Sequence, residues 1–163
     1  MKTVKLYDYQ CRSEINTNET CIINVGCAWM LMNNMDALRM IKAQYPNAKI
    51  MADLKITGED VLNAKLAFDA GADIVSVMGI ASDETLRDVQ MIADENYGEV
   101  LIDMTGVSNL HDRLETAAID GIEYACTPER CEYDDLPITM ASYETRLYTW
   151  LNVHEATLAE AAV

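Results

Sequence analysis

The sequence predicts an α/β fold: a (β/α) barrel of the TIM type, shortened or incomplete, with six to seven parallel strands. Short and nearly continuous apolar runs recur along the chain, which is typical of parallel strands covered by helices. Segments with apolar residues at helical spacing separate these runs. A repeated strand–helix unit with right-handed crossovers forms either an open doubly wound sheet or a closed barrel. No GxGxxG motif follows the first run, which disfavours a dinucleotide-binding sheet and favours the barrel.

Six apolar runs are the predicted strands. Each gathers β-branched and other apolar residues over a few positions, as strands buried on both faces do. The runs cover residues 3–9, 21–26, 49–55, 74–79, 100–106 and 122–127.

Apolar stripes predict four helices between the strands, over residues 35–41, 61–67, 86–93 and 110–117. Pro46 stops the first helix, and Gly71 and Gly121 are suited to close the second and the fourth. Ser82 is suited to cap the third, because its hydroxyl can accept a hydrogen bond from a free backbone N–H group.

The two ends of the chain are less regular. Only about ten residues separate the first two strands, which is short for a crossover helix. After Thr127 we expect an acidic loop at 129–135 and one more short strand at 136–141. A C-terminal helix is predicted over 143–162, because Tyr143, Leu147, Leu151 and Leu158 share one face. A complete barrel has eight strands and generally at least about 200 residues, so we expect a shortened barrel forming a single domain over 1–163.

The charge of the chain narrows the classes of partner. Its 163 residues carry 12 Lys and Arg against 27 Asp and Glu, a formal net charge of -15. Nucleic acid and anionic membrane attract clustered positive charge, so we expect neither as a partner. A single phosphate group can still bind, since one Arg, backbone N–H groups or a metal ion neutralise it locally.

Five cysteines, an odd number without a CxxC pair, indicate a reducing compartment. Their spacing matches no metal site, and we interpret them as buried or incidental thiols. We see no charged leader with an apolar core and no apolar run that approaches the length of a membrane span. We therefore expect a cytoplasmic protein.

Polar residues stand at the ends of several predicted strands, where a purely structural strand would stay apolar. They are Asp8, Asn24, Asp53 with Lys55, and Asp103. The carboxyl ends of parallel barrel strands meet on one face, where active sites of this fold lie. Asp53 and Lys55 are two residues apart, so their side chains point to the same side of the strand. Ala52 and Leu54 then face the opposite layer.

A carboxylate and an ammonium group would thus stand together inside the barrel mouth. Burying such charges is costly unless they pair, bind a metal or meet a ligand. The residues alone leave two interpretations open, a functional site and a structural ion pair at the rim.

Four segments carry a resemblance to a known group of barrels. They are IINVG at 22–26, MADLKI at 51–56, AFDAGADIVSVMG at 67–79 and VLIDMTG at 100–106. Residues 20–127 are thereby similar to the orotidine-monophosphate-decarboxylase-type barrels. Within that group the chain most resembles the 3-hexulose-6-phosphate synthase and 3-keto-L-gulonate-6-phosphate decarboxylase family. The specific part is ADLK followed at a fixed distance by AFDAGADIVSV.

The resemblance implies a site at the strand ends. The family signature D-x-K-x-x-D places its first two residues on Asp53 and Lys55, whereas its last falls on Gly58, next to Glu59 and Asp60. The family also has an acid at the end of the first strand, on the second strand and on the fifth. These positions are Asp8, Asn24 and Asp103 here.

The chemistry implied by the resemblance is a lyase reaction on a small phosphorylated sugar. A Mg²⁺ ion and the lysine stabilise a cis-enediolate, a step that gains from preorganised positive charge in a dry pocket. Asp53 and Asn24 would be the metal ligands and Lys55 the electrophilic cation. Asp8 and Asp103 would be orienting groups. Asn24 offers only a neutral oxygen, which weakens the expected metal affinity.

Two further departures from the family pattern stand in this chain. The family's sixth-strand histidine falls on Ala125, and both histidines, His111 and His154, lie in predicted helices. The family's phosphate site uses glycine-rich loops after the last strands with an Arg nearby. This chain has no Gly-Gly pair. Arg130 has two interpretations, a partial replacement for that Arg and a solvated charge in a loop.

Three hypotheses follow. The chain is a working lyase, an aldolase or a decarboxylase; or a catalytically silent relative that serves as a binding or assembly subunit; or a barrel completed by a partner. A homodimer is expected in each case, since family members are dimers and an incomplete sheet exposes edges that need covering.

Overall fold

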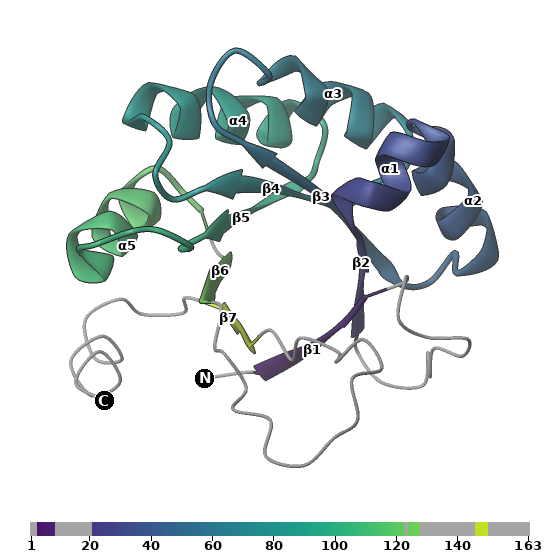
Figure 1. Ribbon diagram of the computed structural model, residues 1–163, viewed down its shortest axis with the longest axis horizontal. Helices are drawn as coiled ribbons and strands as arrows, with labels where there is room; N and C mark the ends of the chain where they lie inside the picture. The colour runs from purple at the N-terminus through teal and green to yellow at the C-terminus, as the bar shows by residue number, and fades with distance from the viewer. Residues whose placement is uncertain (1–2, 9–20, 123, 128–145, 150–163) are drawn as a thin grey trace.

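A computed structural model describes residues 3–8, 21–122, 124–127 and 146–149. In this part of the chain seven strands form a closed barrel in sequence order, which confirms the predicted α/β barrel (Figure 1). The strands are β1 (Thr3–Asp8), β2 (Cys21–Val25), β3 (Lys49–Ile56), β4 (Ile74–Met78), β5 (Glu99–Asp103), β6 (Tyr124–Thr127) and β7 (Arg146–Thr149). All six strands predicted from apolar runs are present.

The barrel closes through a strand that the sequence did not predict. β1 to β6 are parallel, whereas β7 is antiparallel to both β1 and β6. The predicted helix over 143–162 is therefore wrong at Arg146–Thr149. Two sheet edges with unpaired backbone groups outweigh a helical apolar pattern, because a strand between them satisfies both edges. The rest of that helix and the predicted strand at 136–141 lie outside the described residues.

Within the described residues, five helices lie outside the barrel (Figure 1). They are α1 (Cys27–Asn33), α2 (Asp36–Gln44), α3 (Leu62–Asp69), α4 (Asp83–Glu95) and α5 (Leu110–Ile119). The last four confirm the predicted helices, and Ser82 caps α4 by accepting a hydrogen bond from Thr85 N at 3.1 Å. The sequence did not predict α1, because Met30 is its one buried residue and no apolar stripe marks it. None of these helices is long and apolar enough to cross a membrane.

Apolar side chains fill both sides of the sheet. The larger group packs between strands and helices and contains Ala52 and, at its margin, Leu54, as the two-residue period predicted. A second group fills the barrel with one residue from each of five strands: Ile22, Met51, Ile74, Leu101 and Tyr124. Burying a side chain of this size contributes roughly 1.5–3 kcal/mol. This interior layer supports the polar groups that lie above it at the carboxyl ends of the strands.

Candidate active site at the barrel mouth

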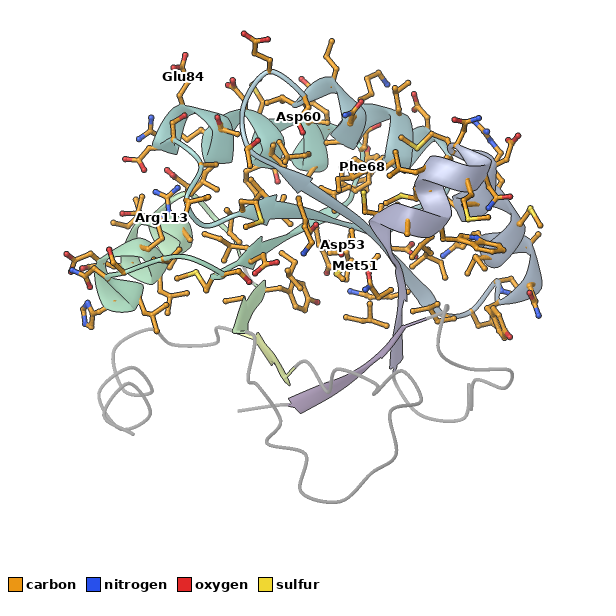
Figure 2. All side chains as sticks on the ribbon, viewed as in Figure 1. Met51, Asp53, Asp60, Phe68, Glu84 and Arg113 are labelled. Atoms are coloured by element: carbon orange, nitrogen blue, oxygen red, sulfur yellow. The ribbon has the colours of Figure 1, made fainter. Side chains whose placement is uncertain are left out.

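Three of the predicted site residues meet at the carboxyl ends of β3 and β5. Lys55 Nζ lies 2.9 Å from Asp103 Oδ2 and 3.3 Å from Asp53 Oδ1. The two carboxylates are largely buried, with side chains 16% and 10% exposed, while the lysine side chain is 48% exposed. Figure 2 shows Asp53 on the inner side of β3 with Met51. One ammonium group therefore bridges two buried carboxylates and still faces solvent.

The backbone of β3 is irregular where it carries these residues. The β3–β4 register runs through Ala52↔Val75 and shifts before Ile56↔Val77. Within this bulge Lys55 has φ 52°, in the left-handed region that a residue with a Cβ enters at a cost of about 1–2 kcal/mol. Asp53 and Lys55 thus share a side, but a bulge, rather than the simple two-residue period, sets their final positions.

Ser76 on β4 joins the two signature residues, and sequence reasoning missed it. Its hydroxyl donates to Asp53 Oδ1 at 2.9 Å and accepts from the backbone N–H of Lys55 at 3.0 Å. The side chain is buried, 1% exposed. The available signal was a single polar residue inside the apolar run 74–78, which is equally typical of a small core residue. We name the set Asp53, Lys55, Ser76 and Asp103 the mouth cluster.

Asp103 is held from both sides. Its Oδ1 accepts from the backbone N–H of Thr105 at 2.9 Å and from the Thr105 hydroxyl at 2.6 Å, which leaves Oδ2 for Lys55. Burial by itself would raise the pKa of this carboxyl group. The hydrogen bonds from Thr105 and the Lys55 ammonium outweigh burial and hold the pKa below its usual 3.8. Asp103 is therefore a carboxylate at neutral pH.

The same contacts keep the lysine charged. Partial burial would lower the pKa of Lys55, but the hydrogen bond to Asp103 and the charges of both carboxylates raise it above 10.5. An ammonium group has three N–H donors. One donates to Asp103 and the ammonium group also pairs with Asp53 at 3.3 Å, which leaves donor capacity among the described contacts for a ligand oxygen.

Asn24 on β2 presents an unpaired oxygen. Its Oδ1 is buried without a hydrogen-bond partner among the described residues. A buried polar atom of this kind costs roughly 1–3 kcal/mol, which points to a ligand or ion as its partner. Asp8 is in register with Asn24 at the end of β1, and its side chain lies outside the described residues.

The donor set is compatible with Mg²⁺ but does not form a closed cage. Within the described residues no group of three or more His, Cys, Asp or Glu could hold a metal ion. Mg²⁺ usually takes one or two protein oxygens and completes its shell with water and substrate. Asp53 and the unpaired oxygen of Asn24 lie on neighbouring parallel strands and can supply those two.

The loop after β3 does not replace the missing signature acid. Asp60 Oδ1 accepts hydrogen bonds from the backbone N–H groups of Thr57 at 3.2 Å and Gly58 at 3.1 Å. It therefore caps its own loop, and Figure 2 shows it well apart from Asp53. Glu59 is exposed. A Cβ added at Gly58 would meet nothing within 4 Å, so the position is open.

The chain also departs from the family pattern at its histidines, at Ala125 and at Arg130. Ala125 is buried in β6 at the position where the family pattern has a histidine. His111 lies on α5 with half its side chain exposed, as expected for a surface residue. Arg130 and His154 lie outside the described residues.

Arg113 on α5 fixes the loop that follows β4, and the sequence did not single it out. Its Nε donates to the carbonyl of Gly79 at 2.6 Å, and its other nitrogens bind the Ala81 carbonyl and Asp83. Its side chain is mostly buried, and Figure 2 shows it beside α5. The described contacts of this arginine are two backbone carbonyls and Asp83, so we assign it a structural role in holding the loop after β4.

Known proteins are similar to this chain in sequence and in fold over part of their length. The 3-hexulose-6-phosphate synthase of Bacillus subtilis is 29% identical over 105 residues, 64% of this chain and 50% of that protein. A probable 3-keto-L-gulonate-6-phosphate decarboxylase of Haemophilus influenzae is 39% identical over 74 residues, 45% of this chain and 33% of that protein. The chain spans about half the length of the curated 3-hexulose-6-phosphate synthases that it matches.

The fold agrees with these matches. The crystal structure of 3-hexulose-6-phosphate synthase from Salmonella typhimurium superposes with a TM-score of 0.61 at 32% identity, covering 64% of this chain and 49% of that chain. Residues 10–132, well over half of the chain, match the orotidine 5'-phosphate decarboxylase / HUMPS family. The resemblance carried by ADLK and AFDAGADIVSV is thereby confirmed. This chain belongs to the orotidine 5'-phosphate decarboxylase / HUMPS family.

Proposed function

We propose that the protein is a phosphosugar carbon–carbon lyase that acts through an enediolate, as a 3-hexulose-6-phosphate synthase-like aldolase or a 3-keto-L-gulonate-6-phosphate decarboxylase-like enzyme. The observation that carries the proposal is the Lys55 ammonium, held between two largely buried carboxylates with N–H donor capacity left over. The family supports the reaction class, and the relatives named above support the two branches.

Both reactions need the same stabilisation. Loss of CO₂ from a β-keto acid, or of a proton from the hydroxyl-bearing carbon beside a ketone, leaves an electron pair that delocalises onto the ketone oxygen. The enediolate that forms carries this oxygen next to the oxygen of the adjacent hydroxyl group. A preorganised cation in a partly dry site stabilises that charge more than water does, because the site needs no reorganisation. Lys55 would donate a remaining N–H to one of these oxygens. Asp53 and Asp103 would keep Lys55 protonated and hold its ammonium group in position.

A divalent cation fits this scheme. Asp53 and Asn24 would hold Mg²⁺, which supplies Lewis-acid stabilisation of developing negative oxygen when bound. Asp8, at the end of β1 beside Asn24, is proposed as a further orienting acid.

Enzyme assay of two lysine variants tests the proposal. Lys55→Ala is expected to lower kcat/KM for the active substrate by about 10²–10³-fold, the range found on loss of one oxyanion-stabilising group. Lys65→Ala is the matched control: its ammonium also pairs with a carboxylate, Asp69 at 3.3 Å, but on the exposed face of α3. Control activity should match the natural protein. Equal rates for all three proteins would contradict the role of Lys55.

The silent relative remains the second candidate, because Gly58 and the buried Ala125 remove two groups implied by the family pattern. Calorimetric titration with ribulose 5-phosphate and Mg²⁺ separates the two. Binding without turnover of either substrate favours the silent relative, and turnover excludes it.

We also propose a homodimer. Leu62 and Leu66 lie one turn apart on α3 and are 70% and 52% exposed, an apolar face that a second copy would cover. Light scattering after size exclusion should give twice the chain mass, and a stable monomer contradicts this.

A cytoplasmic location and the exclusion of nucleic acid and membrane remain predictions from the net charge and the cysteines.

A further inference from the structure

We propose that Ser76 is a positioning residue of the mouth cluster: one buried hydroxyl fixes both the Asp53 carboxylate and the left-handed backbone of Lys55, and so sets the place of the lysine ammonium. The inference rests on the proposed lyase function for its catalytic consequence. Its structural content can be tested without that function.

The Ser76 hydroxyl lies where the regular pairing of β3 with β4 is interrupted. Pairing of β3 with β4 is regular up to Ala52↔Val75 and shifts before Ile56↔Val77. Residues 53–55 on β3 therefore face a single residue of β4, which is Ser76. The Lys55 N–H points to the serine oxygen at 3.0 Å. A side chain thus replaces the backbone acceptor that a regular ladder provides.

The contacts close a ring through one lysine. Ser76 Oγ accepts from the Lys55 backbone and donates to Asp53 Oδ1, and the same carboxylate oxygen lies 3.3 Å from Lys55 Nζ. The backbone N–H of Lys55 is thereby bonded to Ser76, and its ammonium group is paired with Asp53, which is itself bonded to Ser76. A hydroxyl is needed for this, because it donates and accepts at once.

Core packing alone does not call for a serine here. Two of its neighbours on the inner face of the barrel are apolar: Ile74, two residues before it, and Leu101, in register on β5. The β4–β5 ladder keeps an unbroken register over five pairs. The polar group therefore serves the bulge of β3 and the two charged residues that it carries.

A pair of variants of nearly equal volume isolates the hydroxyl. Ser76→Thr keeps it, whereas Ser76→Val removes it, and the two side chains have nearly the same shape. Ser76→Ala removes the hydroxyl without adding volume and repeats the test if the larger side chains unfold the barrel. Thr85→Val is the control, since Thr85 is also buried but its hydroxyl bonds Ser82 at the start of α4, away from the mouth cluster.

Steady-state kinetics and amide hydrogen exchange give two independent readouts. With an active natural protein, Ser76→Val should lower kcat by about 10²-fold, the scale of loss for an ångström of misplacement, with a smaller change in KM. Ser76→Thr should stay within about threefold and Thr85→Val should leave kcat unchanged, as neither moves the lysine. Equal kcat in the Thr and Val variants overturns the inference.

Exchange at the Lys55 amide separates this inference from the proposed function. Ser76→Val should speed exchange at that amide at least tenfold relative to Ser76→Thr, while amides of the β4–β5 ladder keep their protection. Unchanged protection of Lys55 overturns the positioning role. If the natural protein turns over neither sugar, the proposed lyase function fails, and amide exchange alone decides on Ser76.

Discussion

The barrel carries a lysine–carboxylate pair between β3 and β5 at each of its two ends. At the mouth Lys55 pairs with Asp103, and at the opposite end, which we name the floor, Lys49 pairs with Glu99. The floor lysine also lies 3.3 Å from the hydroxyl of Tyr124 and 5.6 Å from its ring centroid. An apolar layer separates the two ends. Charged residues at a strand end are therefore not by themselves a sign of function.

The two ends differ in charge balance and in backbone. Among the described side chains, the floor pairs one ammonium group with one carboxylate, in the regular part of β3. Those at the mouth comprise one ammonium group for two carboxylates, a lysine with left-handed backbone and an unpaired buried oxygen on Asn24. Unbalanced charge and local strain persist where a ligand is to be bound, since structure alone gains little from them. That difference favours the mouth as the active site.

Replacing the lysine at each end of the barrel in turn is expected to give the largest difference between the mouth and the floor. Lys55→Met is expected to lower kcat/KM by about 10²–10³-fold. Lys49→Met should leave kcat/KM unchanged. It should lower the free energy of unfolding by only about 0.5–1 kcal/mol, as for a half-exposed ion pair. Parallel assays and urea unfolding measure both. Equal activity losses from the two variants would contradict the assignment of separate roles.

Replacing Asn24 by aspartate is expected to raise the affinity of the mouth for Mg²⁺. Asn24→Asp adds a charged oxygen where Oδ1 is unpaired, so Mg²⁺ should bind about tenfold more tightly. Without metal the extra carboxylate beside Asp53 should lower the Tm, and Mg²⁺ should restore it. Asn63→Asp, an equal change of charge at a partly exposed position of α3, should show neither effect. A Tm that is insensitive to Mg²⁺ in Asn24→Asp argues against a metal at this position.

Filling the open signature position tests how far the mouth departs from the family pattern. The backbone at Gly58 is not in the left-handed region, and an added Cβ meets nothing within 4 Å. Gly58→Asp should therefore fold with a Tm close to that of the natural protein and raise kcat, by roughly tenfold for a restored acid–base group. Gly58→Ala controls for the loss of glycine. A Tm that falls equally in both variants would show that the glycine itself is required.

The smallest expected effect is the pH dependence of stability at the mouth. The pKa of Asp103 is lowered from 3.8, so the stability it contributes is present above that value and is lost as pH falls through the folded pKa. The pKa of Lys55 is raised from 10.5, so its contribution is present below that value and is lost as pH rises. The difference in unfolding free energy between the natural protein and Asp103→Asn should therefore be constant from about pH 5 to about pH 9 and shrink in acid. A difference that varies steadily across neutral pH would contradict these shifts.

Much of the fold followed from the sequence because apolar periodicity is a local signal. Six strands and four helices were predicted from it, whereas α1 has no apolar stripe and β7 forms only because two distant edges need a partner. The polar strand ends predicted Asp53, Lys55 and Asp103. The bulge of β3 and the role of Ser76 could not be predicted, since both depend on the register of neighbouring strands, which no single segment encodes.

Proton exchange at the carbon beside the ketone of a pentulose 5-phosphate tests the proposed enediolate chemistry at the mouth most directly. In D₂O with Mg²⁺, the natural protein should replace one proton at that carbon with deuterium, as followed by proton NMR, and Lys49→Met should do the same. Lys55→Met should show exchange near the uncatalysed rate. Exchange that is equally fast in Lys55→Met, or absent from the natural protein, would contradict the proposal.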